Sequence, residues 1–244
     1  MSNHTIICKN CENQFSGHFC NNCGQRANLH RIDLKHLVHE FFHALTHLDK
    51  GLLYTAKMML LEPGQTLRDY LQGKRVKHSN PFLMLLIIGG LCSLTYYNFE
   101  LKLPSSFKIN ELDGGLHVID SKFFAILYIV YSLYFSICDY LFFRYKGYNF
   151  TELFTINVFI ATEVLLTLLA LVPLWLIGGH FDINKYLRVF VGLSFISYIV
   201  FVRYQFFEVK GDKKAGTRLI LEAIVFLLFF IAISWKTFSI VLTS

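Results

Sequence analysis

The sequence predicts an all-α polytopic membrane protein with about five transmembrane helices, preceded by amphipathic helices and a small cysteine-rich head. Hydrophobic residues make up 54% of the 244 residues and charged residues only 16%, which is less charge than a soluble domain of this length carries. The apolar residues gather in runs of roughly 17–25 residues, the length that crosses a bilayer. The chain is therefore expected to divide into a head at 1–31, a juxtamembrane region at 32–80 and a membrane domain at 81–244.

Two C-x-x-C pairs mark the head, and their spacing predicts a metal site. Cys8 and Cys11 form the first pair, and Cys20 and Cys23 form the second. Two such pairs can supply four thiolates to one tetrahedral zinc ion, and paired C-x-x-C spacing favours this over the alternative, two disulfides. A four-thiolate site has no open coordination position, so the zinc would be structural. It would also supply the folding free energy of a short zinc ribbon.

The net charge of +6 indicates membrane topology and contact with anionic lipid before it indicates nucleic-acid binding. The head carries Lys9, Arg26 and Arg31 but has neither a recognition helix nor a basic run. These features argue against a nucleic-acid partner. The partners that we expect are the lipid bilayer and a protein at the cytoplasmic face.

Residues 32–50 are expected to form an amphipathic helix, because polar side chains recur at spacings of three and four. One face carries His36, His39, Glu40, His43 and His47. His39, Glu40 and His43 match the H-E-x-x-H pattern of zinc peptidases, in which the glutamate activates water. Such a site requires a third ligand, and His47 lies too far along the same helix to join both others on one ion. Glu62 or Asp69 could serve, but nothing in their context singles them out. Three interpretations stay open: a polar face at the membrane surface, which we favour, a non-catalytic metal or proton-sensing site, and a catalytic metal site with Glu40.

Two further helices are expected before the membrane. The first covers residues 51–61 and is ended by Glu62-Pro63-Gly64, since proline and glycine break helices. The second covers residues 67–72, with Thr66 as its cap and Gly73 as its end. Asn80-Pro81 suits the cap and first turn of the first span. A basic cluster at the membrane surface accompanies them, formed by Arg68, Lys74, Arg75 and Lys77.

Several of these motifs together resemble a known family. They are Cys8, Cys11, Cys20, Cys23-Gly24-Gln25, Leu48-Asp49-Lys50-Gly51, Tyr54-Thr55, Pro63-Gly64, Tyr70-Leu71, Gly73-Lys74-Arg75 and Asn80-Pro81-Phe82. The pattern resembles the bacterial membrane proteins called domain of unknown function 3667, known mostly from Bacteroidetes. Glu12 departs from the glycine that commonly follows such a cysteine pair, which loosens the first turn. The resemblance implies a membrane location and a zinc ribbon, and it implies no activity.

Five spans are predicted, at about 81–99, 123–143, 153–177, 189–202 and 219–235. Arg188 and Arg203 bound the short fourth span and are expected to extend outward toward the membrane surface. Basic residues gather before the first span, after the second and after the fourth, which places these segments in the cytoplasm. The N-terminus would then be cytoplasmic, in agreement with reduced cysteines, and the protein would lie in the inner (cytoplasmic) membrane. The residues are Arg68, Lys74, Arg75, Lys77, Arg144, Lys146, Arg203, Lys210, Lys213, Lys214 and Arg218.

Polar residues inside the predicted spans are candidates for function, because burying them in a membrane is costly. Asp139 and Glu222 lie near the cytoplasmic ends, where ion pairs with Arg144, Arg203 or Arg218 are expected. Glu163 lies near the middle of the third span, with Asn157 about two turns away. Glu163 is interpreted either as part of a polar cavity or as a helix-packing hydrogen bond.

Three functions follow from these features. The favoured one is a non-enzymatic membrane protein whose zinc head and amphipathic helix recruit or sense a cytoplasmic partner. The second is a small transporter or channel with Glu163 in its path. The third is a membrane metallopeptidase that uses His39, Glu40 and His43.

Overall fold

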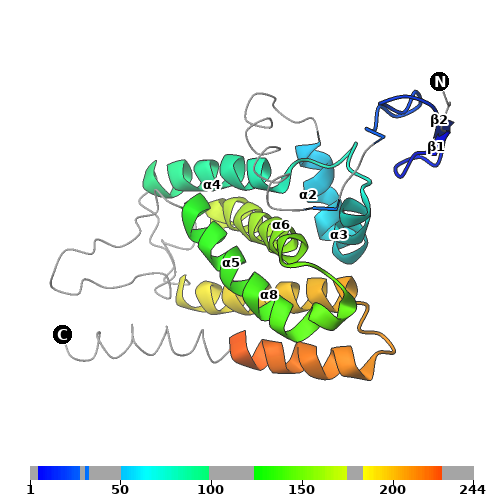
Figure 1. Cartoon of the computed structure of the whole chain (residues 1–244). Coiled ribbons are helices and arrows are strands. Elements are labelled where there is room, and N and C mark those ends of the chain that lie inside the picture. The colour runs from blue at the N-terminus through cyan, green and yellow to red at the C-terminus, as the bar shows by residue number, and fades with distance from the viewer. Residues whose placement is uncertain (1–4, 28–30, 33–50, 99–123, 175–183, 227–244) are drawn as a thin grey trace, which may run out of the picture.

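The computed structural model describes residues 5–27, 31–32, 51–98, 124–174 and 184–226 (Figure 1). Within these ranges the chain is mostly helical, with a small two-stranded head at the N-terminal side. The predicted histidine helix at 32–50 lies almost wholly outside the described residues, so His36, His39, Glu40, His43 and His47 stay predictions.

The head folds around a short hairpin and two cysteine turns. Strand β1 (Ile6–Ile7) pairs antiparallel with β2 (Gln14–Phe15), and Ile6 lies opposite Phe15. Phe15 is buried against Cys8 and Cys20, so the small core of the head consists of one aromatic ring and the cysteines. A core of this size cannot offset the entropy of ordering the segment, which agrees with a fold held by metal.

Helices α2 (Leu52–Leu61) and α3 (Pro63–Gln72) follow each other with Glu62 between them. The predicted start of the second helix at 67 is wrong, because α3 already begins at Pro63. Proline fits the first position of a helix, where its missing N–H costs nothing. Thr66 therefore lies inside α3, where its hydroxyl donates to the carbonyl of Glu62 at 2.8 Å. Gly73 ends α3 with φ of 102°, as its position predicted.

Helix α6 (Phe150–Ala170) is the centre of the bundle. Residues 155–165 are all buried, and α4 (Pro81–Asn98) and α5 (Phe124–Phe143) both pack against α6. Asn149 and Glu152 form a capping box at its start. Asn80 caps α4 by accepting from the backbone N–H of Phe82 at 3.0 Å.

Helix α8 (Asn184–Phe206) and a helix at residues 213–226 complete the described bundle. The start of α3 packs directly on the end of α8, because a Cβ added at Gly64 would lie 2.4 Å from the Cβ of Gln205. Helix 213–226 runs antiparallel to α5: Arg218 donates to the carbonyl of Phe142, and the rings of Phe226 and Phe135 lie 4.6 Å apart. Figure 1 shows this helix in orange beside α8.

Two described helices are long and apolar enough to cross a membrane, namely Ala125–Lys146 and Phe150–Leu174. The first has an exposed stripe of large apolar side chains at spacings of three and four. These are Ile126, Val130, Leu133, Ile137 and Leu141. An apolar stripe along a whole helix is costly to expose to water.

Candidate functional site

The four head cysteines converge on one point. The Sγ atoms of Cys8 and Cys23 lie 3.5 Å apart, those of Cys11 and Cys20 lie 3.6 Å apart, and all four fall within 4.8 Å of one another. A disulfide requires about 2.05 Å, so these are four free thiols. Four sulfurs placed about 2.3 Å from a central zinc ion would be about 3.8 Å apart. The cluster therefore fits a tetrahedral metal ion.

Two matching turns bring the cysteines together. In the first, Cys8 N–H donates to Asn13 O, and Glu12 N–H donates to Cys8 O, both at 2.9 Å. In the second, Cys20 N–H donates to Gln25 O at 2.8 Å, and Gly24 N–H donates to Cys20 O at 2.9 Å. Glu12 and Gly24 hold the equivalent position, with φ of 60° and 75°. Glu12 therefore adopts a left-handed conformation that glycine takes at no steric cost.

The second turn also favours thiolate at Cys20. Burial raises the pKa of this thiol, but hydrogen bonds from the backbone N–H groups of Cys23 and Asn22 and from the side chains of Cys11 and Cys8 together lower the pKa to about 6. Burial and the other three thiols raise the pKa of Cys23, in the same turn, to about 11. A thiolate is the form that binds metal. When bound, a metal ion would link the two turns, and the four cysteines would leave it no open position for a substrate.

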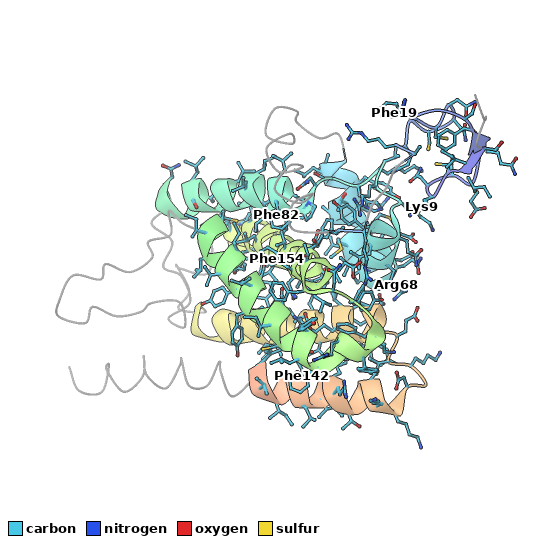
Figure 2. The ribbon with its side chains drawn as sticks, viewed as in Figure 1. Lys9, Phe19, Arg68, Phe82, Phe142 and Phe154 are labelled. Carbon is cyan, nitrogen blue, oxygen red and sulfur yellow. The ribbon has the colours of Figure 1, made fainter. Side chains whose placement is uncertain are left out.

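The surface of the head carries large apolar side chains. Ile7 is 63% exposed and Phe19 is 57% exposed, and the guanidinium of Arg26 lies 5.9 Å from the centre of the Phe19 ring. Figure 2 shows Lys9 and Phe19 on this part of the chain. Large exposed side chains on so small a domain are suited to contact with another surface.

Inside the helical body, Arg203 forms the centre of a buried polar cluster. Its Nε donates to Asp139 Oδ1 at 3.0 Å, and its NH2 group donates to Asn157 Oδ1 at 2.8 Å. Asn157 Nδ2 in turn donates to Asp139 Oδ2 at 2.6 Å. Glu222 lies 3.7 Å from Arg203 and has no hydrogen bond to its carboxyl oxygens in the described part of the chain. Arg203 is thus the partner of both Asp139 and Glu222.

This position of Arg203 corrects one expectation. Its place at the end of a predicted span suggested that it extends outward, yet it is 2% exposed and points into the bundle. The reason is charge: Asp139 and Glu222 face it from α5 and helix 213–226, and a carboxylate is the partner that a buried guanidinium needs. Sequence reasoning placed Asn157 beside Glu163, whereas its side chain lies in the Arg203 cluster.

Glu163 is separate from that cluster. It is 1% exposed, and neither of its carboxyl oxygens has a hydrogen-bond partner among the described residues. The neighbouring threonine hydroxyls form hydrogen bonds within α6. Thr167 donates to the backbone carbonyl of Glu163, and Thr162 donates to the backbone carbonyl of Val158. The predicted helix-packing hydrogen bond to Glu163 is therefore not seen in the described part of the chain.

The basic residues before α4 have distinct contacts. Arg68 donates to the carbonyl of Gln205 at 2.5 Å and lies 3.5 Å from Glu208, so it fixes α3 to the end of α8 (Figure 2). Lys74 pairs with Asp69 at 2.9 Å. Arg75 donates to the carbonyl of Tyr70 and stacks on its ring, while Lys77 is exposed.

Sequence reasoning missed a contact between the end of the head and the bundle. Arg31 donates to both carboxyl oxygens of Glu152, at 2.5 and 2.7 Å, and to the carbonyl of Gly147. The capping-box pattern could have identified Glu152 as a carboxylate at the start of α6, but its partner Arg31 lies far away in the sequence. The contact places the end of the head beside the α5–α6 turn.

These features define the class: a helical protein with membrane-length helices and an N-terminal four-cysteine cluster that could hold a metal ion. Comparison with known families adds one match, over part of the chain. Residues 49–92, from the start of α2 into α4, match the family described as protein of unknown function DUF3667, which confirms the resemblance over this stretch. No curated protein and no solved structure matches the chain.

The matched stretch has clear structural roles. Gly64 allows α3 to touch α8, Gly73 ends α3 in a left-handed conformation, and Asn80 caps α4. Residues within the matched stretch therefore fix α2 and α3 to the bundle and begin α4.

Proposed function

We propose that this chain is a non-enzymatic, multi-pass protein of the inner membrane whose zinc ribbon recruits or senses a partner in the cytoplasm. The observation that carries the proposal is the closed cluster of four cysteines, all within 4.8 Å, on a head with exposed apolar side chains. A four-thiolate metal has no position for a substrate, so the head is suited to binding a protein and not to catalysis. The amphipathic segment at 32–50 would lie at the membrane surface beside it.

The arrangement of charge supports a multi-pass topology. Arg68 reaches Glu208, Lys146 pairs with Asp212 at 2.8 Å, and Arg31 binds Glu152. The segments before α4, between α5 and α6, and after α8 therefore lie at the same end of the bundle, as alternating spans require. Their excess of Lys and Arg favours the cytoplasmic side. The apolar stripe of α5 would face lipid.

Metal content per chain tests the head. Detergent-purified wild type is expected to hold one zinc ion, and the Cys20→Ser/Cys23→Ser variant none. A metal that survives this double substitution would instead place a site on the histidine segment at 32–50, and the peptidase hypothesis would replace ours.

Site-specific photo-crosslinking in cells tests recruitment. A photoreactive residue at Phe19 is expected to give a crosslinked product of defined mass that disappears with Cys20→Ser/Cys23→Ser. Gln14, which is exposed and polar on the same head, is the matched control position. The recruitment proposal fails if Phe19 gives no product, or if Gln14 gives the same one.

A transporter or channel is the second candidate, and it is favoured by the buried carboxyl of Glu163, which has no hydrogen-bond partner among the described residues. A carboxyl group inside a membrane-length helix is a typical element of a proton or ion path. The test is proton flux into liposomes that contain the purified protein. Loss of flux in Glu163→Gln, with unchanged thermal stability, would support the path, and equal flux in both proteins would exclude a role for this carboxyl.

A further inference from the structure

Cationic side chains gather around one aromatic ring where α5 ends and helix 213–226 begins. The Arg218 guanidinium lies 4.2 Å from the centre of the Tyr145 ring, and the ammonium groups of Lys214 and Lys146 lie 4.6 and 5.8 Å from it. The Tyr145 hydroxyl is buried and has no partner among the described residues. We call Tyr145, Lys146, Lys214 and Arg218 the Tyr145 cluster.

The described partners of this cluster leave excess positive charge. Lys146 pairs with Asp212 at 2.8 Å, and Arg218 donates to the carbonyl of Phe142. Lys214 is exposed and forms no ion pair in the described part of the chain. Cations this close repel one another, and one carboxylate offsets only part of that repulsion. A bound anion would lower the energy of the cluster.

The surroundings of the cluster are apolar on one side. Helix 213–226 packs antiparallel to α5, and both helices carry exposed apolar side chains, which together we call the apolar surface. On α5 this surface includes Leu141, which is 66% exposed, and Ile137. On helix 213–226 it includes Ile220, which is 63% exposed, and Leu221 and Ile224. A ligand that matches both parts has an anionic group and a long apolar tail.

We propose that the Tyr145 cluster binds the phosphate of an anionic phospholipid whose acyl chains lie on the apolar surface of α5 and helix 213–226. The inference rests on the membrane location in the proposed function and adds a defined lipid site to it. Lysine and arginine bind phosphate through charge-assisted hydrogen bonds, and basic pockets at the cytoplasmic ends of spans bind lipid headgroups. Free phosphate would match the cations but would leave the apolar surface uncovered.

Thermal stability of the full chain in neutral detergent tests the site. Phosphatidylglycerol is expected to raise the Tm in a saturable way, while phosphatidylcholine and inorganic phosphate leave the Tm unchanged. Lys214→Gln should weaken apparent binding of phosphatidylglycerol about fivefold, as expected for the loss of one cation near an anionic surface. Lys213→Gln removes the neighbouring exposed lysine, which is not among the described cations over the Tyr145 ring, and should bind like wild type.

If Lys213→Gln and Lys214→Gln weakened the binding of phosphatidylglycerol equally, the proposed site would be overturned, because the net positive charge alone would explain the binding. Stabilisation by inorganic phosphate as large as that by phosphatidylglycerol would overturn the lipid assignment in favour of a soluble anion. The Tm of Lys214→Gln without lipid shows whether the variant is folded, and Lys146→Gln provides a second test if it is not. Recovery of the protein in the membrane fraction, tested separately, distinguishes failure of this site from failure of the membrane proposal.

Discussion

Glu12 is the one non-glycine residue of the head with a left-handed backbone, among the residues described. Such a conformation costs a residue with a Cβ of order 1 kcal/mol. Glu12→Gly should therefore stabilise the folded head by about 0.5–1 kcal/mol and slow the release of metal to a chelator. Glu12→Ala is the control, because it removes the same charge but keeps the Cβ. Faster release from the glycine variant than from the alanine variant would contradict this account.

The buried ring of His78 is expected to make the stability of the fold depend on pH. Burial lowers the pKa of its ring, Asp69 raises it in part, and Lys77 adds to the lowering. The fold thus favours neutral His78, and its contribution to stability is complete above about pH 6.5 and declines as the pH falls below it.

His78→Phe keeps an aromatic ring against Tyr54 and Tyr70 and cannot take up a proton. The fall in Tm between pH 7 and pH 5 should be smaller in this variant than in wild type. His18→Gln, at an exposed histidine of the head, is the control. A fall of wild-type size in His78→Phe would show that other groups set the pH dependence.

Features that depend on residues close together in the sequence could be predicted from the sequence. The cysteine spacing predicted the cluster of four cysteines, Gly73 the end of α3, and Asn80 the cap of α4. The start of α3 was missed because Pro63 has two roles, breaking one helix and beginning the next. The expected ion pairing of Asp139 and Glu222 is confirmed, and Arg203 is the partner among the three arginines considered. The expected outward extension of Arg203 was wrong, because the packing of three other helices encloses it.

At the scale of elements, Gly64 joins α3 to α8. A Cβ at this position would lie 2.4 Å from the Cβ and 2.7 Å from the carbonyl carbon of Gln205. Gly64→Ala must therefore separate the two helices, which should cost about 1–3 kcal/mol of unfolding free energy. Gly90→Ala is the control, because a Cβ there meets nothing within 4 Å. A lower Tm in Gly90→Ala than in Gly64→Ala would contradict the close approach.

The Arg203 cluster joins α5, α6, α8 and helix 213–226, and its two carboxyl groups are not equivalent. Asp139 accepts hydrogen bonds from Arg203 and Asn157, whereas Glu222 accepts none among the described residues. Asp139→Asn should lower the unfolding free energy by about 3–5 kcal/mol, the cost of breaking a buried ion pair. Glu222→Gln leaves that pair intact and should cost much less. Denaturation of both variants in detergent measures the difference, and equal losses would mean that Glu222 shares the pair.

At the scale of the whole molecule, the contacts of Arg68, Lys146 and Arg31 place three basic segments at one end of the bundle. Exposed lysines on these segments should therefore react together with a membrane-impermeant amine reagent. Lys77 and Lys213 are suitable reporters, since both are exposed and lie on different segments. Under the proposed topology both are modified in inside-out vesicles and protected in right-side-out vesicles, as read by peptide mass spectrometry. Detergent-solubilised protein, in which both should react, is the control. Modification of the two lysines from opposite faces would overturn the alternating arrangement of spans, and modification of both from outside would invert the orientation and place the metal head outside the cytoplasm.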